Sequence, residues 1–123
     1  MAKKKSKMLD PVQTLREIAL AYPESSETTS CNKAAFKAGK KSFLFVGQKE
    51  DSYNVMLKLG DSLDEATLLE SKRPENFNVG KGGWTTLRFP LTDSPDGDLF
   101  DRWIEESYRL LATKTLVREL DES

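Results

Sequence analysis

An apolar alternation repeated on either side of a short polar turn constrains this chain more than any other feature. In the run 53–59, every second side chain is apolar, and the residues between them are polar or methionine. This is the pattern of a strand with one covered face. The run 42–48 is also rich in β-forming residues, and residues 49–52 between the two runs are polar. Two such runs joined by a short turn pair as neighbours, so the sequence predicts a small antiparallel sheet.

The 42–48 run is expected to be a central strand. Simple alternation places Phe43 and Phe45 on one face and Leu44 and Val46 on the other. The other expected non-helical elements are a strand over 35–38 before a turn at Gly39-Lys40, a strand over 84–89, a loop or exposed strand over 24–30, and a glycine-rich loop over 76–83.

Three helices are expected around the sheet. The first covers 11–21, with Asp10 as its N-cap and a proline at the first helical position, where a missing N–H costs nothing. A short second helix is expected over 61–71, and a long C-terminal helix begins near Asp98. Ser107 interrupts the apolar stripe of this last helix, where its small side chain would let the helix approach the sheet closely.

Length and composition favour one α+β domain. A chain of 123 residues can bury roughly two-thirds of its unfolded surface, and its 37% apolar and 32% charged residues are typical of a globular protein. No apolar run approaches membrane-spanning length, and the basic start lacks the apolar segment of a secretory signal. We therefore expect a cytoplasmic protein without a membrane partner. The expected organisation is a flexible basic tail over 1–9, a domain over 10–115 and an acidic C-terminal tail over 116–123.

Charge is segregated along the chain. Residues 1–9 carry +4, residues 10–30 carry −3, residues 31–91 carry +3 and residues 92–123 carry −5. The span 31–49 holds five lysines and no acidic residue. Such a span suits a surface for polyanions. A solvated lysine edge that discourages aggregation between sheets has the same sequence, so both interpretations stay open.

The residue types argue against most catalytic chemistry. The chain has no histidine, which removes the usual general base and the commonest metal ligand. Cys31 is the single cysteine, so no internal disulfide forms, and no base that would activate its thiol is identifiable. The carboxylate pairs of the helices are adjacent in sequence and point in different directions. We expect no enzyme activity, no metal and no cofactor.

Two further features allow both a functional and a structural interpretation. The stretch 78–83 could let backbone N–H groups approach a phosphate, but it lacks the Walker spacing and leads into a strand, which favours a hairpin connection. Trp84 and Trp103 could stack on bases, although their strand and helical spacing is typical of core residues.

Three blocks of residues, LREIALAYPE at 15–24, AFKAGKKSF at 35–43 and EESYRLLA at 105–112, occur with Trp84 leading the strand between the last two. With this spacing the chain resembles the MmcQ/YjbR family of small bacterial proteins over nearly all of residues 10–114. The resemblance implies an α+β fold with an antiparallel sheet, helices on one face and two β-hairpins described as a double-wing motif. It also implies DNA binding, a label that the family carries by analogy of shape.

Carried onto this chain, the first wing is the 35–43 hairpin and the second lies around 76–88. The resemblance implies that the basic residues of these wings, and those of the preceding helix end, contact phosphates. They are Lys37, Lys40, Lys41, Lys72, Arg73, Lys81 and Arg88.

The leading hypothesis is a monomeric, non-enzymatic module that binds nucleic acid weakly and without sequence specificity, DNA being the expected partner. A sequence pI near 5.6 argues against tight binding, because affinity depends on neutralised phosphates. The alternative is a protein-interaction or regulatory module that docks an unidentified partner through its acidic C-terminal helix or an exposed sheet face. A small ligand between the sheet and that helix, near Trp103 and Tyr108, is a third possibility.

Overall fold

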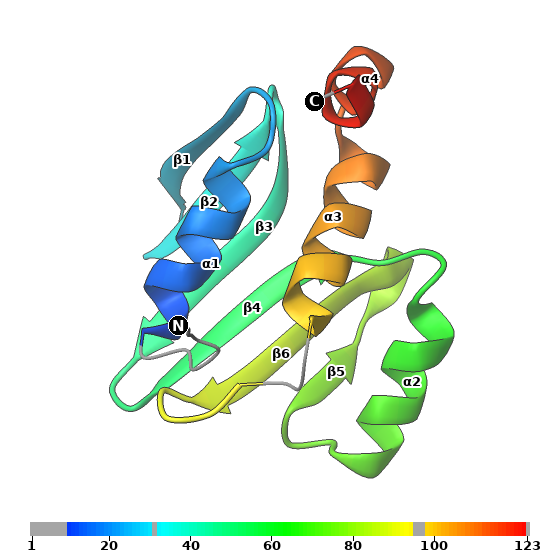
Figure 1. Cartoon of the computed structure of the whole chain (residues 1–123). Coiled ribbons are helices and arrows are strands. Elements are labelled where there is room, and N and C mark those ends of the chain that lie inside the picture. Colours follow the sequence, from blue (N-terminus) through cyan, green and yellow to red (C-terminus); the bar gives the residue numbers. More distant parts are fainter. Residues whose placement is uncertain (1–9, 31, 95–97, 123) are drawn as a thin grey trace.

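The centre of the protein is an antiparallel sheet whose last two strands are not in sequence order (Figure 1). The computed structural model describes residues 10–30, 32–94 and 98–122. Within this part of the chain, six strands hydrogen-bond in the order β1-β2-β3-β4-β6-β5. The strands are β1 (Ser25–Ser30), β2 (Lys33–Ala38), β3 (Lys41–Lys49), β4 (Ser52–Lys58), β5 (Phe77–Val79) and β6 (Trp84–Pro90). The expected α+β class and central position of the 42–48 strand are confirmed.

The described helices pack on one side of this sheet. They are α1 (Pro11–Leu20), α2 (Leu63–Lys72), α3 (Leu99–Leu111) and α4 (Lys114–Glu122). Figure 1 shows α1 and α3 in front of the sheet and α2 beside β5. The side chain of Asp10 accepts a hydrogen bond from the N–H of Gln13 at 3.1 Å, which confirms its N-cap role.

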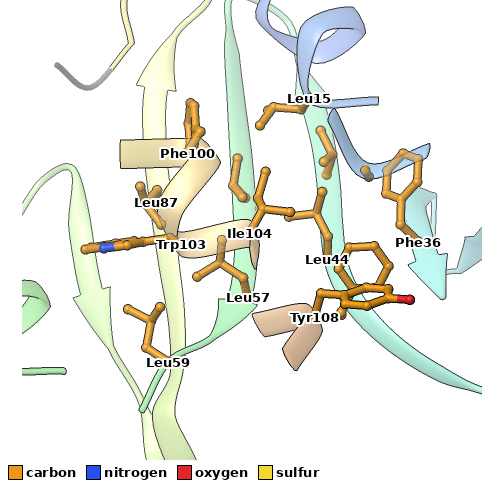
Figure 2. Close-up of a cluster of buried hydrophobic side chains, with 14 of the residues drawn as sticks. Leu15, Phe36, Leu44, Leu57, Leu59, Leu87, Phe100, Trp103, Ile104 and Tyr108 are labelled. Atoms are coloured by element: carbon orange, nitrogen blue, oxygen red, sulfur yellow. The ribbon is translucent and has the colours of Figure 1, made fainter. Parts of the chain in front are cut away.

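The core lies between the helices and one face of the sheet. Figure 2 shows Trp103 and Ile104 of α3 among the leucines of the core, with Trp103 between Leu59 and Leu87 in this view. Both α3 side chains are fully buried. The indole Nε1 of Trp103 donates to Glu65 at 3.1 Å, which joins α3 to α2. The alternating apolar residues of β4 and β6 therefore face the helices.

A β-bulge in β3 alters the faces expected there. Phe36 pairs with Leu44 but the next residue, Lys37, pairs with Ser42, so Phe43 is an extra residue on β3. Phe43 turns to the helical side, where its ring lies 5.1 Å from that of Tyr108. The expectation that Phe43 and Phe45 share a face is wrong, because the inserted residue breaks the alternation.

Ser107 replaces a rung of the β3–β4 ladder beside this bulge. Its hydroxyl donates to the carbonyl oxygen of Phe43 at 2.6 Å and accepts from the N–H of Lys58 at 2.9 Å. The next rung toward the middle of the sheet is the regular pair Leu44 and Leu57. A small hydroxyl residue on the sheet-facing side of α3 thus lets the helix approach closely, as expected, and also joins the two strands.

The stretch 25–30, expected as a loop or an exposed strand, is the edge strand β1. Two further differences follow from tertiary contacts. The expected loop over 76–83 contains β5, whose Phe77 is buried against Phe89 and Trp103. The segment expected as an acidic tail from residue 116 belongs to α4, and its Leu116 is buried near Gly39. Cys31 and the expected basic tail over 1–9 lie outside the described residues.

The carboxylate of Glu106 caps α2 from α3. It accepts from the N–H of Gly60 at 2.6 Å, from the N–H of Ser62 at 3.0 Å and from the Ser62 hydroxyl at 2.6 Å. Burial raises the pKa of this carboxyl, but the hydrogen bonds from Ser62 and Gly60 outweigh burial and hold the pKa below its ordinary value. The charged form is therefore favoured by folding.

This cap predicts an acid-sensitive contribution to stability. A depressed folded pKa gives stability that is present above the unfolded pKa, about 4.3, and is lost as pH falls through the lower folded value. We expect the Tm of wild type to exceed that of Glu106→Gln at pH 6 and the gap to shrink toward pH 3. Glu119→Gln on α4 is the control. A gap between wild type and Glu106→Gln that stays constant with pH would contradict this role.

Candidate functional site

The sheet face opposite the helices is a candidate binding surface. The register places every second residue of each strand there, and no helix of the described chain lies over it. Its middle row runs across the sheet through the paired residues Ala35, Phe45, Met56, Thr86 and Asn78. This face is broad, and its centre is partly apolar.

Two aromatic rings approach each other at the centre of this face. The rings of Phe45 on β3 and Trp84 on β6 have centroids 6.0 Å apart and planes inclined at 57°. The strand β4 lies between them, so their backbones are about 9.5 Å apart. The two rings therefore lean toward each other across β4, where Met56 lies. All three side chains are only partly buried.

Basic residues occupy the rows on both sides of the middle row. One flanking row contains Lys58 and its partner Trp84, two residues beyond Met56 and Thr86 of the middle row. Lys37 lies in the same row, two residues beyond Ala35 of the middle row. Arg88 lies on the other side, paired with Asn54. The strand positions of this face bear no acidic side chain. We call the surface formed by the following residues the basic face: Lys33, Lys37, Phe45, Lys49, Met56, Lys58, Trp84 and Arg88.

The cations of the basic face are not neutralised by ion pairs. In the described residues, each ion pair involves one of three arginines on the helices: Arg16, Arg102 or Arg109. The aliphatic stem of Lys33 lies along the sheet, because a Cβ built on Gly47 would be 3.2 Å from Lys33 Cγ. Lysine stems that cover a sheet in this way leave their ammonium groups in solvent.

Acidic residues bound the basic face at one end. Glu50 and Asp51 form the tip of the β3–β4 hairpin, next to Lys49. A hollow of about 570 Å³ is also found here, lined by Arg73 and Arg88 together with Asp51, Glu75 and Asp93. This end of the basic face is therefore mixed in charge.

Comparison with known proteins identifies the family. The YjbR family model matches residues 20–110. The chain belongs to the YjbR family. The crystal structure of the Deinococcus radiodurans protein DR2400, with a DUF419 domain, matches with a TM-score of 0.67 at 21% identity, covering 89% of this chain and 87% of that one. This likeness shows the shared fold. A search of curated proteins finds no match.

In this YjbR protein, the seven basic residues implied by the resemblance do not form one cluster. Lys37, Lys40 and Lys41 lie at the β2–β3 turn, and Lys81 lies in the 3-10 turn Lys81–Gly83 that precedes β6. Both turns are at the same end of the sheet, but β3 and β4, separated there by Ser107, lie between them.

The other three residues lie toward the opposite end. Lys72 and Arg73 end α2, and the Arg73 guanidinium lies 5.8 Å from the Phe89 ring, on the helical side. Its Nε also donates to the side chain of Asn76 at 3.2 Å. Arg88 is on the basic face but lines the acidic hollow. Of the seven, Lys37 and Arg88 therefore share the basic face.

Sequence reasoning missed part of the basic face of this YjbR protein. Lys33, Lys49 and Lys58 were not among the expected contacts, and Phe45 was not considered for stacking. The alternation of β4 and β6 already separated Lys58 and Trp84 from the apolar set of each strand. Alternation along single strands does not give the register between strands. That register, which depends on the strand order and the β3 bulge, brings the outward-facing residues of the strands together.

Two further searches of the described residues were negative. No group of three or more histidine, cysteine, aspartate or glutamate side chains is close enough to hold a metal ion in the described part of this YjbR protein. Among the same residues, no helix has both the length and the apolar character needed to cross a membrane.

Proposed function

We propose that this YjbR protein is a non-catalytic module that binds nucleic acid through the basic face. The observation that carries the proposal is a sheet surface with basic residues on four strands, aromatic rings between them and no acidic side chain at its strand positions. Neighbouring strands are about 4.8 Å apart, so the cations from β2 to β6 extend over about 14 Å. This width suits the backbone of a polyanion.

The acidic net charge sets the expected strength of binding. The chain carries a formal charge of −1, but many of its acids lie on the helices, away from the basic face. Such a distribution orients the protein toward a polyanion without giving high affinity. We expect dissociation constants in the range of about 10⁻⁴ to 10⁻⁶ M at physiological salt, typical of nonspecific binding.

Catalysis is not part of the proposal because the face lacks the groups that reactions require. The chain has no histidine, and the basic face offers cations, aromatic rings and amides but no general base. Lysines and aromatic rings are instead the residue types that hold phosphates and bases.

Removing the lysines of the face should weaken binding in a salt-dependent way. In the triple variant Lys33→Gln, Lys37→Gln and Lys58→Gln, three phosphate contacts are lost while the first two methylenes of each side chain remain. We expect the slope of log K against log salt to become shallower by about 2 to 3, because each contact contributes about 0.7 to 0.9. Fluorescence anisotropy of a labelled oligonucleotide, titrated at several salt concentrations, measures this slope.

The matched control removes three cations from the helices, with Lys72→Gln, Lys114→Gln and Arg118→Gln. It has the same net charge as the face variant, so a general electrostatic effect would weaken both proteins equally. Equal losses, or no binding by wild type at low salt, would contradict the proposal and leave the protein-interaction alternative.

A further inference from the structure

We infer that the nucleic acid held on the basic face is single-stranded, with bases stacked on Phe45 and Trp84. The inference rests on the proposed function and names its ligand. It is drawn from the position of the aromatic pair, which lies in the middle of the sheet and not at its edge.

The aromatic rings are placed where a duplex could not use them. In a duplex the bases are stacked on each other and present only their edges in the grooves, so their faces are inaccessible to a protein ring. A single strand has no such restriction, and its unstacked bases can lie flat on aromatic side chains. The partly exposed rings of Phe45 and Trp84, on a surface without a helix over it, meet this requirement.

The cations are placed for the backbone of the same strand. Lys37 and Lys58 lie in the row on one side of the middle row, and Lys33 and Arg88 lie on its other side. A base on Phe45 would therefore have basic side chains in the rows on either side, and a base on Trp84 would lie in the row of Lys58. Such an alternation of stacking platforms and cations is the arrangement that binds single strands with little sequence preference.

The shape of the protein also disfavours a duplex. A protein that reads a duplex inserts a helix or a β-ribbon into one of its grooves. The tip of the β3–β4 hairpin bears Glu50 and Asp51, which would repel phosphates. The two basic turns, at Lys40 and Lys81, are on separate hairpins on either side of the β3–β4 junction.

The test compares single strands with a duplex and removes one ring at a time. The probes are labelled dT12, rU12 and a 12-base-pair DNA duplex, each measured by anisotropy at the same low salt. We expect the wild type to bind one or both single strands at least tenfold more tightly than the duplex. Phe45→Leu should weaken single-strand binding about tenfold and change duplex binding less than twofold, while Phe45→Tyr, which retains a ring, should restore it.

Intrinsic fluorescence gives a second reading that does not depend on the label. The chain has two tryptophans, of which Trp103 is buried in the core and Trp84 is on the basic face. Stacking of a base on Trp84 should quench part of the emission of the wild type. Trp84→Phe should lose this quenching but keep the affinity within about threefold, because phenylalanine also stacks.

The outcomes separate the two proposals. Duplex binding as tight as single-strand binding, or unchanged single-strand affinity in Phe45→Leu, would overturn the single-strand inference while leaving nucleic-acid binding in place. Absence of binding to all three probes would overturn the proposed function itself. A thermal melt of each variant confirms that the compared proteins are folded.

Discussion

Gly83→Ala is expected to lower the free energy of unfolding by about 2 to 5 kcal/mol, a large part of the stability of a small domain. Gly83 has a φ of +87°, and a Cβ at this position would lie 2.2 Å from the carbonyl oxygen of Leu59. The backbone conformation costs about 1 to 2 kcal/mol for an alanine, and the forced shift of Leu59 adds about 1 to 3 kcal/mol. Urea denaturation measures the loss.

The neighbouring glycine provides the control. Gly82 has a similar φ of +67°, but a Cβ there would meet nothing closer than 4.0 Å. Gly82→Ala should therefore show the conformational cost without the clash. The backbones of Gly83 and Leu59 are held together, because the N–H of Leu59 donates to the Gly83 carbonyl at 2.8 Å. Equal losses in the two variants would mean that Leu59 can still move aside freely, which would contradict the prediction.

Ser107→Ala should cost about 2 to 4 kcal/mol. The substitution removes the hydroxyl that bonds both the Phe43 carbonyl and the Lys58 N–H, and α3 covers the position. Each buried backbone group left without a partner costs about 1 to 3 kcal/mol. A fall of roughly 10 °C in Tm is expected for a chain of this size.

Ser71→Ala is the matched control for this prediction. Its hydroxyl donates to the Leu68 carbonyl on an exposed helix, where water can replace it. We expect a change within about 0.5 kcal/mol there. A similarly small change in Ser107→Ala would show that β3 and β4 close the gap without the hydroxyl.

The strands and helices with strong periodicity were predictable from sequence. Every second residue of the 53–59 run is apolar, which predicted β4 and its covered face, and Asp10 marked the start of α1. The failures have a common cause in contacts between distant residues. Phe43 changes face at the β3 bulge, where its carbonyl accepts from Ser107 of α3, and Phe77 of β5 packs on Phe89 and Trp103.

The candidate site was predictable in part. The basic character of the 31–49 span led to Lys37, which lies on the basic face, but equally to Lys41, which pairs with Ala38 on the other side. The sequence allowed both tryptophans, Trp84 and Trp103, to be either core residues or residues that stack on bases. The structure separates them, since Trp103 is fully buried and Trp84 lies beside Phe45. Register, rather than composition, decides between these positions.

Confining the helices to one side of the sheet has an evolutionary consequence. Most of the packing that stabilises the fold lies on that side, so substitutions on the other side cost little stability. Homologous proteins can therefore diverge there, acquiring or losing an affinity while the architecture persists. Ligand preference in such a lineage would then change faster than its scaffold.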